Sequence, residues 1–540
     1  EELEEDPYDV LMNTKGWESV AAVIDKELKN FAKESQKKKF EVADAKNRLE
    51  ISDAKKSYQC PNYMIIGNPG VGKTTVAKLI GRIFKDRGIL KNGNVILVNS
   101  SALIGEYVGQ TPSKTNRVID SARGGVLIID EAYSLYADPN RSNEDNSGAY
   151  RQEAIDTIVA RALDHDVCII LAGYQKTRKL YEMNEGLPRR FTEIVIDDYP
   201  SDLLEDIFYK LCEKNQIKVN EAIDTTRFFK NLKKFSPKRS FGNAGTVNNV
   251  FDNVVKNMND RNHYTNELIM EDFKDYQRYF IDVGSRKIVD QIFAEIDQNY
   301  VGMSNLKEFI EELRFDVLRE KDAESKGIAV NKTKRNILLI GNPGTGKTTT
   351  AKLLARFFFE MGVLASETMI SLKANATSSR ELAIQIEEAN DKGALLFIDE
   401  ANYYCNIGNA GKEMISPILN PSEDFENYPD LRIVMAIYPE NKGKFYDLDS
   451  GIERRFREFT LHNYTADELY QIFEILRKKE QLVFATETNE FGYSLNDYLK
   501  GYFIYQERTG NVDRKNASLA VDLVSQLTNN YYKRKEVINE

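Results

Sequence analysis

Two short glycine-rich segments of this chain have the residue types and the spacing of a phosphate-binding loop. The pattern G-x-x-x-x-G-K-T occurs at Gly67–Thr74 and again at Gly341–Thr348. Glycines let backbone N–H groups curl around phosphate oxygens, and the N-terminus of a following helix adds a favourable dipole. We expect Lys73 and Lys347 to reach the β and γ phosphates of a nucleoside triphosphate. The sequence therefore predicts two ATP sites.

The context of both segments also favours nucleotide binding. Each one follows a short apolar stretch and precedes a stretch with a helical pattern, which a chance match would lack. The hydroxyls of Thr74 and Thr348 are placed to bind Mg²⁺. The predicted ATP-binding residues are Gly67, Asn68, Pro69, Gly70, Val71, Gly72, Lys73, Thr74 and Thr75 in the first half, and Gly341, Asn342, Pro343, Gly344, Thr345, Gly346, Lys347, Thr348 and Thr349 in the second.

An acidic pair ends a second apolar stretch in each half of the chain. Asp130 and Glu131 form the first pair, and Asp399 and Glu400 form the second. A carboxylate at the end of a buried strand is costly unless it has a partner, and Mg²⁺ held directly or through water is such a partner. The glutamate of each pair is placed to orient or deprotonate the attacking water. The alternative is an acidic turn at a strand end with no catalytic role.

Two arginines precede the last apolar stretch of each half. They are Arg189 with Arg190, and Arg454 with Arg455. An arginine delivered to the γ-phosphate stabilises the charge of the transition state. If it came from a neighbouring subunit, hydrolysis would depend on ring assembly. The alternative is a surface pair in solvent or in a salt bridge.

These motifs lie in the same order in both halves, which indicates a tandem repeat. As a fourth landmark, Phe241-Gly242-Asn243 pairs with Thr509-Gly510-Asn511. Short apolar strands alternate with helices in each half, which is typical of a parallel sheet covered on both faces. We therefore predict an α/β fold of two tandem P-loop modules, each an α/β domain followed by a small helical lid.

The predicted domain boundaries follow the changes in composition and periodicity. The charged stretch 25–57 is most simply a helix with a solvated face. The predicted parts are an N-terminal helical segment at 1–58, α/β domains at 59–199 and 286–463, and helical lids at 200–285 and 464–540.

The composition indicates in which compartment the protein acts and which classes of partner it does not attract. The 540 residues include 74 Lys and Arg against 84 Asp and Glu, a formal net charge of -10. An acidic chain has no overall attraction for nucleic acid or an anionic membrane. No apolar run approaches the roughly 18 residues of a membrane span, and the few scattered cysteines and histidines predict neither a disulfide framework nor a zinc site. With no export signal evident, we expect a cytoplasmic protein.

Together these motifs resemble the AAA+ superfamily and, more narrowly, the CbbX/CfxQ group, which includes red-type Rubisco activase, stage V sporulation protein K and the ATPase of type VII secretion. The segments that carry the resemblance are Gly67–Gly70, Leu103–Thr111 with Lys114-Thr115, Asp130–Leu135, Ala172–Tyr174, Arg190-Phe191 and Phe241–Ala244. The resemblance implies a Mg²⁺-dependent ATPase, a hexameric ring that remodels a client protein. A nucleotide-dependent scaffold or secretion-system component is the alternative, and a nucleic-acid motor is less favoured.

The resemblance also assigns Tyr107 and Val108 to a loop that faces the ring pore and grips polypeptide. Gly105 and Gly109 flank this pair and favour a mobile loop, whereas the alternative is a tyrosine packed against its own domain. The corresponding stretch 372–380 is polar and contains no aromatic residue. The two modules should therefore differ in role.

Two nucleotide-sensing roles that the resemblance implies have no evident residue. The arginine expected after the Gly-Asn-Ala of the lid is replaced by Gly245 in the first half, and by Asp513, followed by Arg514, in the second. A polar sensor is likewise not evident at Ala172-Gly173 or at Ala436-Ile437. The sequence predicts no residue for either role.

Overall fold

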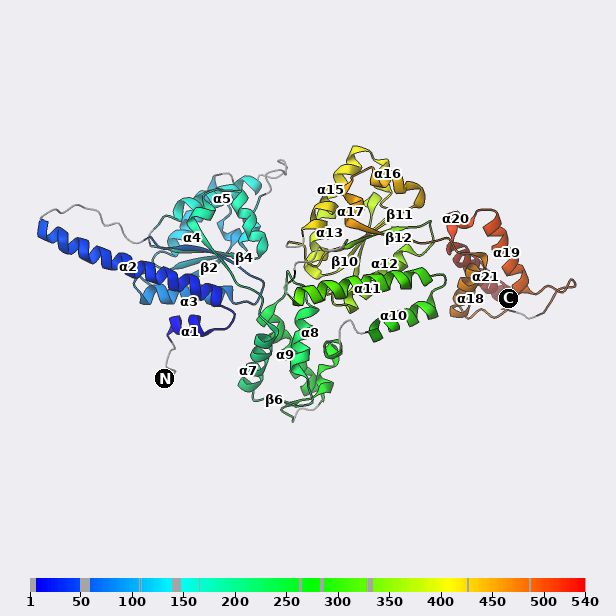
Figure 1. Ribbon diagram of the computed structural model, residues 1–540, viewed down its shortest axis with the longest axis horizontal. Helices are drawn as coiled ribbons and strands as arrows, with labels where there is room; N and C mark the ends of the chain where they lie inside the picture. Colours follow the sequence, from blue (N-terminus) through cyan, green and yellow to red (C-terminus); the bar gives the residue numbers. More distant parts are fainter. Residues whose placement is uncertain are drawn as a thin grey trace. The chain divides into compact units, whose positions relative to one another are not determined.

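The computed structural model describes residues 6–48, 59–105, 107, 109–137, 147–164, 166–261, 265–281, 286–326, 328, 334–424, 427–484 and 487–539. The chain forms two compact units, one of Glu1–Lys233 with Ser240–Tyr279 and the other of Lys234–Arg239 with Phe280–Glu540. Each unit contains one five-stranded sheet, and the labels below follow Figure 1.

The first sheet is parallel and has the strand order β2-β3-β4-β1-β5. Its strands are β1 (Asn62–Ile66), β2 (Val95–Asn99), β3 (Val126–Asp130), β4 (Cys168–Gly173) and β5 (Phe191–Val195). Because β4 lies between β1 and β3, the residues after β4 emerge between the first phosphate loop and the first acidic pair. All three connections therefore meet at the carboxyl edge of the sheet.

The second sheet repeats this order as β9-β10-β11-β8-β12, again with parallel pairing. Its strands are β8 (Asn336–Ile340), β9 (Met369–Lys373), β10 (Leu395–Asp399), β11 (Arg432–Ile437) and β12 (Phe456–Thr460). Two parallel α/β sheets with one topology confirm the tandem fold predicted from the sequence.

Helices cover both faces of each sheet, which is why the central strands are apolar except at their ends. In the second module Leu338 packs with one helical layer and Leu339 with the other, as alternation along a strand requires. Figure 1 shows the same layering in the first module. The covering helices are α1 (Pro7–Asn13), α2 (Glu18–Arg48), α3 (Lys73–Asp86), α4 (Gln110–Ser121) and α5 (Ser147–Arg161) in the first module, and α10 (Arg286–Asn299), α11 (Ser304–Ser325), α12 (Lys347–Glu360), α13 (Ser379–Lys392), α14 (Tyr403–Asn406) and α15 (Asn409–Glu423) in the second.

A smaller group of helices follows each sheet. The first group also contains two-residue strands, β6 (Lys218–Val219) and β7 (Glu267–Leu268), which pair in parallel. The prediction of a purely helical lid at 200–285 is therefore wrong in this detail. The helices are α7 (Ser201–Lys214), α8 (Thr225–Lys234) and α9 (Asn243–Arg261) after the first sheet, and α18 (Ala466–Lys479), α19 (Leu495–Arg508), α20 (Val512–Lys515) and α21 (Ser518–Asn539) after the second. The boundaries between sheet domains and lids remain predictions.

Candidate nucleotide sites

Each phosphate loop joins a buried central strand to a long helix. Gly72 and Gly346 cap α3 and α12 in the left-handed conformation, with φ of 88° and 94°. Glycine adopts this conformation without the steric cost that a Cβ atom would add. The first N–H groups of each helix have no partner within the helix, so the loop and helix together form a cradle of donors suited to an anion.

The loop lysines fold back onto their own loops. The Nζ atom of Lys73 donates to the carbonyl oxygens of Gly67 at 2.8 Å and Asn68 at 3.0 Å. Lys347 makes the same two contacts with its own loop at the same two distances. Within the described ranges neither ammonium forms an ion pair within 4 Å, so each can pair directly with a phosphate.

Burial lowers the pKa of both loop lysines. For Lys347 the pKa falls to about 8, although the nearby carboxylates of Asp399 and Glu400 act in the opposite direction. The pKa of Lys73 is lowered for the same reason, with Asp130 as the first opposing charge. These effects show that the acidic pairs lie close enough to the lysines to influence them electrostatically.

The acidic pairs have the same backbone geometry in both modules. Glu131 and Glu400 have φ of 52° and 53°, which is unusual for residues other than glycine. In each pair the aspartate accepts a hydrogen bond at 2.9 Å from the N–H of the following glutamate. A strained conformation that occurs at two equivalent positions indicates a constrained carboxylate, as functional sites often have.

The residues present fit ATP with Mg²⁺. A buried ammonium and a cradle of backbone donors suit the phosphates, while hydroxyl and carboxylate oxygens are the ligands that Mg²⁺ prefers. Thr74 and Thr348 lie at the second position of their helices, and Asp130 and Asp399 end the strands β3 and β10. Both donor sets therefore lie at the carboxyl edge of a sheet.

An aromatic ring lies next to each loop lysine, which the sequence reasoning missed. The ammonium of Lys73 lies 5.4 Å from the ring centroid of Tyr174, and that of Lys347 lies 4.8 Å from the ring of Tyr438. The two tyrosines directly follow β4 and β11. The signal was available, because Ala-Gly-Tyr and Ala-Ile-Tyr occupy matching places in the repeat.

The arginine pairs differ between the modules. Arg189 is exposed, and Arg190 donates to the Val159 carbonyl oxygen at 2.8 Å. In contrast, both Arg454 and Arg455 form ion pairs at 2.6 Å with Glu423. In the described part of the chain, no hydrogen bond or ion pair joins these arginines to the phosphate loop of their own module. Exposed ion pairs are weak, so the contact of the exposed Arg454 with Glu423 can be exchanged at an interface, whereas Arg455 is largely buried.

The structure corrects the fourth sequence landmark. The counterpart of Asn243 is Asn516, and not Asn511, because Asn243 and Asn516 have φ of 45° and 44° and each donates at 3.1 Å to the proline carbonyl oxygen of its phosphate loop. The error arose because Gly-Asn recurs five residues earlier in the second lid. We call residues 242–245 and 515–518 the lid turns.

This correction moves the position at which an arginine was expected. The residue that follows the Asn-Ala pair is Gly245 in the first lid turn and Ser518 in the second. Asp513 and Arg514 lie in the short helix α20 instead. Neither lid turn therefore carries an arginine at this position.

A second missed feature is the residue that covers the outer side of each phosphate loop. The indole Nε1 of Trp17 donates to the Val71 carbonyl oxygen at 2.9 Å, and a Cβ atom on Gly72 would lie 2.7 Å from the indole. Met303 covers Gly346 in the second module. The sequence contains little indication of this equivalence, because the two segments share only the glycine that precedes Trp17 or Met303.

The predicted client-gripping residue is exposed. Tyr107 has 68% of its surface accessible, so it does not pack against its own domain. Gly109 follows in the left-handed conformation with φ of 79° and caps α4. Val108 lies outside the described residues.

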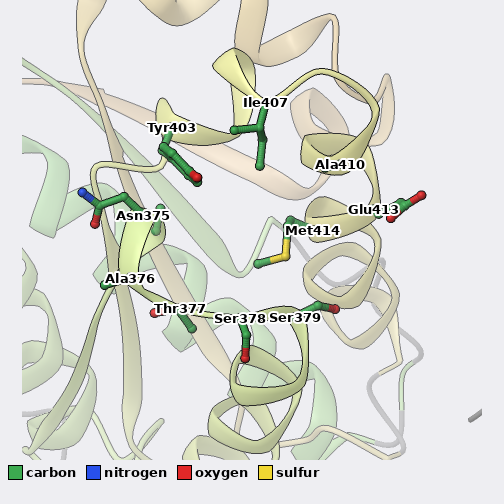
Figure 2. Close-up of a pocket in the computed structure, with 11 residues that line it drawn as sticks. Asn375, Ala376, Thr377, Ser378, Ser379, Tyr403, Ile407, Ala410, Glu413 and Met414 are labelled. Atoms are coloured by element: carbon green, nitrogen blue, oxygen red, sulfur yellow. The ribbon is translucent and has the colours of Figure 1, made fainter.

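The corresponding place in the second module holds a pocket instead of an aromatic loop. After β9 the chain makes a short turn at Ala374–Ala376, and Ser378 caps α13. The pocket, of about 430 Å³, lies between this turn and α14 and α15, with Tyr403 and Met414 pointing into it (Figure 2). The two modules thus present different surfaces at equivalent positions.

Among the residues that the structure describes, no helix is long and apolar enough to cross a membrane. Over the same ranges, no group of three or more His, Cys, Asp or Glu side chains could hold a metal ion.

Several known proteins are similar to this chain. Stage V sporulation protein K of Bacillus subtilis is 34% identical over 204 residues, which are 37% of this chain and 61% of that protein. The CfxQ homologue of Pyropia yezoensis is 37% identical over 194 residues, 34% of this chain and 61% of the homologue. ESX-3 secretion system protein EccA3 of Mycolicibacterium smegmatis is 32% identical over 241 residues, 42% of this chain and 38% of EccA3. The matches thus span about three fifths or less of these relatives.

Solved structures support the fold. The Saccharomyces cerevisiae Hsp104-ADP complex superposes with a TM-score of 0.53 and 15% identity over 89% of each chain. A closed state of Hsp104 with ATPyS and FITC casein gives a TM-score of 0.52, again with 15% identity and 89% of both chains. The sequence pattern of the ATPase family associated with various cellular activities (AAA) matches residues 63–198 and 337–491. Since these two segments cover more than half of the 540 residues, one in each module, the protein belongs to the AAA family of ATPases.

Proposed function

We propose that this chain is an ATP-driven protein remodeller that works as a ring, with the hexamer that the AAA+ resemblance implies as the closed form. The observation that carries the proposal is the exposed Tyr107 on a glycine-flanked loop, in a chain with two candidate nucleotide sites. An exposed aromatic side chain offers apolar contact to polypeptide of any sequence. Nucleotide turnover at the adjacent site would move this loop and pull the bound segment.

In each proposed site, different residues bind the phosphates, hold Mg²⁺ and activate the attacking water. Lys73 would leave the two carbonyl oxygens of its loop for the phosphates, and Thr74 with Asp130 would hold Mg²⁺, which neutralises phosphate charge when bound. Glu131 would orient and deprotonate the attacking water. The second module has a counterpart for each of these residues, and we assign them the same roles: Lys347, Thr348, Asp399 and Glu400.

Assembly would complete the active sites. The arginines before β5 and β12 are proposed to reach the γ-phosphate bound by a neighbouring copy, which makes the contact head-to-tail and closes a ring. Arg189 is exposed and available for this role, whereas Arg454 and Arg455 would first have to leave Glu423. We therefore expect the first module to respond more directly to assembly.

A nucleotide-dependent scaffold is the second candidate, and the second module favours it. This module has a pocket where the first has an aromatic loop, and its arginines are engaged within the module. A ring held by ATP at such sites could assemble partners, including those of a secretion system, without threading them.

Retention of an unfolded polypeptide separates the two candidates. The Glu131→Gln chain should bind ATP at the first site without hydrolysing it there, and should retain a fluorescently labelled unfolded polypeptide in gel filtration. Lys73→Ala is the matched control, because it removes phosphate binding in the same module. Retention that needs ATP and is lost in Glu131→Gln/Tyr107→Ala supports the remodeller. Retention that is unchanged without Tyr107 would favour the scaffold.

A further inference from the structure

The lid turns hold the phosphate loops through the same set of contacts in both modules. Asn243 donates to the Pro69 carbonyl oxygen at 3.1 Å and accepts from the Tyr199 N–H at 2.7 Å. Asn516 donates to Pro343 at 3.1 Å and accepts from Tyr464 at 3.0 Å. Both asparagines are fully buried. Such repetition at two sites of different sequence indicates that the geometry is required.

The backbones of the lid turns and the phosphate loops also touch. The N–H of Ala244 donates to the Gly70 carbonyl oxygen at 3.4 Å, and that of Ala517 donates to Gly344 at 3.2 Å. A Cβ atom on Gly70 would lie 2.0 Å from the Gly242 carbonyl oxygen. The glycine is thus needed for close approach of the lid as well as for the turn of the loop.

A third residue joins each asparagine to the phosphate loop, and here the modules differ. The Asp198 carboxylate accepts from Asn243 at 2.8 Å and from the Asn68 side chain at 3.0 Å. In the second module Asn463 takes this place, accepting from Asn516 at 3.1 Å and from Asn342 at 3.0 Å. The connection is therefore made through a carboxylate in one site and through a neutral amide in the other.

The lid turn sits where a lid helix begins. Asn243 is the first residue of α9, and Asn516 lies two residues before α21. A rotation of either helix therefore displaces the groups that hold the phosphate loop. The residue after the Asn-Ala pair of each lid turn is Gly245 or Ser518, and neither has a long side chain that could reach the nucleotide. The contact between lid helix and phosphate loop therefore does not depend on such a side chain.

We propose that Asn243 and Asn516 are positioning residues that hold each phosphate loop in its nucleotide-binding shape and transmit the position of the lid to it. This inference rests on the proposed ATP binding at both sites and adds a route by which nucleotide and lid influence each other. Binding of nucleotide fixes the loop, the loop fixes the asparagine, and the asparagine fixes the start of the lid helix.

The second module offers the sharper test because it contains a matched control. Asn511 lies in the same part of the lid and is exposed, and in the described structure its side chain bonds only that of its near neighbour Gln506. In a Lys73→Ala background, which leaves only the second site, Asn516→Ala should weaken binding of a fluorescent ATP analogue at least about tenfold, since three hydrogen bonds of the loop and lid are lost. Asn511→Ala should leave binding unchanged.

Hydrogen exchange separates positioning from a general loss of stability. Without nucleotide, Asn516→Ala should speed exchange at the amides of residues 344–347 while the amides of β8 stay protected as in the parent chain. Asn516→Asp keeps the acceptor for Tyr464 and loses the donors to Pro343, so it should weaken binding even if the alanine variant unfolds. Asn243→Asp should weaken nucleotide binding at its site more than Asn516→Asp does at the second site. The new carboxylate at 243 would face the carboxylate of Asp198, whereas that at 516 would face the neutral amide of Asn463.

The outcomes are distinct. If the Lys73→Ala parent binds no nucleotide, the proposed second ATP site is wrong and the inference falls with it. If the parent binds and Asn516→Ala, Asn516→Asp and Asn511→Ala all bind equally well, the ATP site stands and the positioning role is overturned.

Discussion

ATP binding at the second site should weaken as the pH rises above neutrality. Burial lowers the pKa of Lys347 to about 8, from an ordinary value of 10.5. Phosphate binding requires the ammonium form, so at a pH above 8 the site must take up a proton in order to bind. With a pKa of 8, the ammonium fraction is about 90% at pH 7 and about 10% at pH 9. The affinity should therefore fall roughly tenfold between these two values.

Calorimetry on the Lys73→Ala chain tests this reasoning. The apparent binding enthalpy at pH 9 should depend on the ionisation enthalpy of the buffer, with an uptake approaching one proton, and this dependence should nearly vanish at pH 7. Phosphate groups are almost fully ionised throughout this range, so they contribute little to the change. An affinity that is constant from pH 7 to pH 9, with no proton uptake, would refute a buried lysine with a lowered pKa.

Three further predictions concern the sites and assembly. Trp17 is the only tryptophan, so its emission should change when ATP binds to a Lys347→Ala chain, and fluorescence titration should show loss of the change in Trp17→Phe. Tyr438→Leu should tighten ATP binding by about 1 kcal/mol, because it removes the cation–π contact that holds Lys347 in the site without nucleotide. Tyr438→Phe keeps an aromatic ring and should bind ATP as the parent does. Weaker ATP binding by Tyr438→Leu would contradict this reasoning. Glu131→Gln/Glu400→Gln with ATP should sediment as a ring at tens of micromolar protein, well above typical micromolar affinities. Monomer alone would argue against nucleotide-linked assembly.

The sheets were predictable because their signals are local and strong. β1 (Asn62–Ile66) and β8 (Asn336–Ile340) each begin with a buried asparagine and continue as an apolar run, because strands buried on both faces are mostly apolar. The phosphate loops and acidic pairs were equally plain, because phosphate chemistry restricts the residue types at each position.

The contacts around the loops were not predictable in the same way. Asn516 was missed because Gly-Asn at 510–511 imitates the motif, and only the hydrogen bonds to Pro343 and Tyr464 identify the true counterpart. Trp17 and Met303 differ in size and polarity, so their shared place next to a loop glycine leaves little trace in sequence. Such positions depend on tertiary packing, which periodicity does not report.

The central claim is that the first module grips a client through Tyr107, and stimulation of ATPase activity by an unfolded polypeptide tests it most directly. Tyr107→Ala should keep the basal rate, because the loop makes no phosphate contact, and should lose the stimulation. Lys373→Ala and Asn375→Ala, in the equivalent part of the second module, should keep both. Equal loss of stimulation from both loops, or full stimulation of Tyr107→Ala, would contradict the account and favour the scaffold.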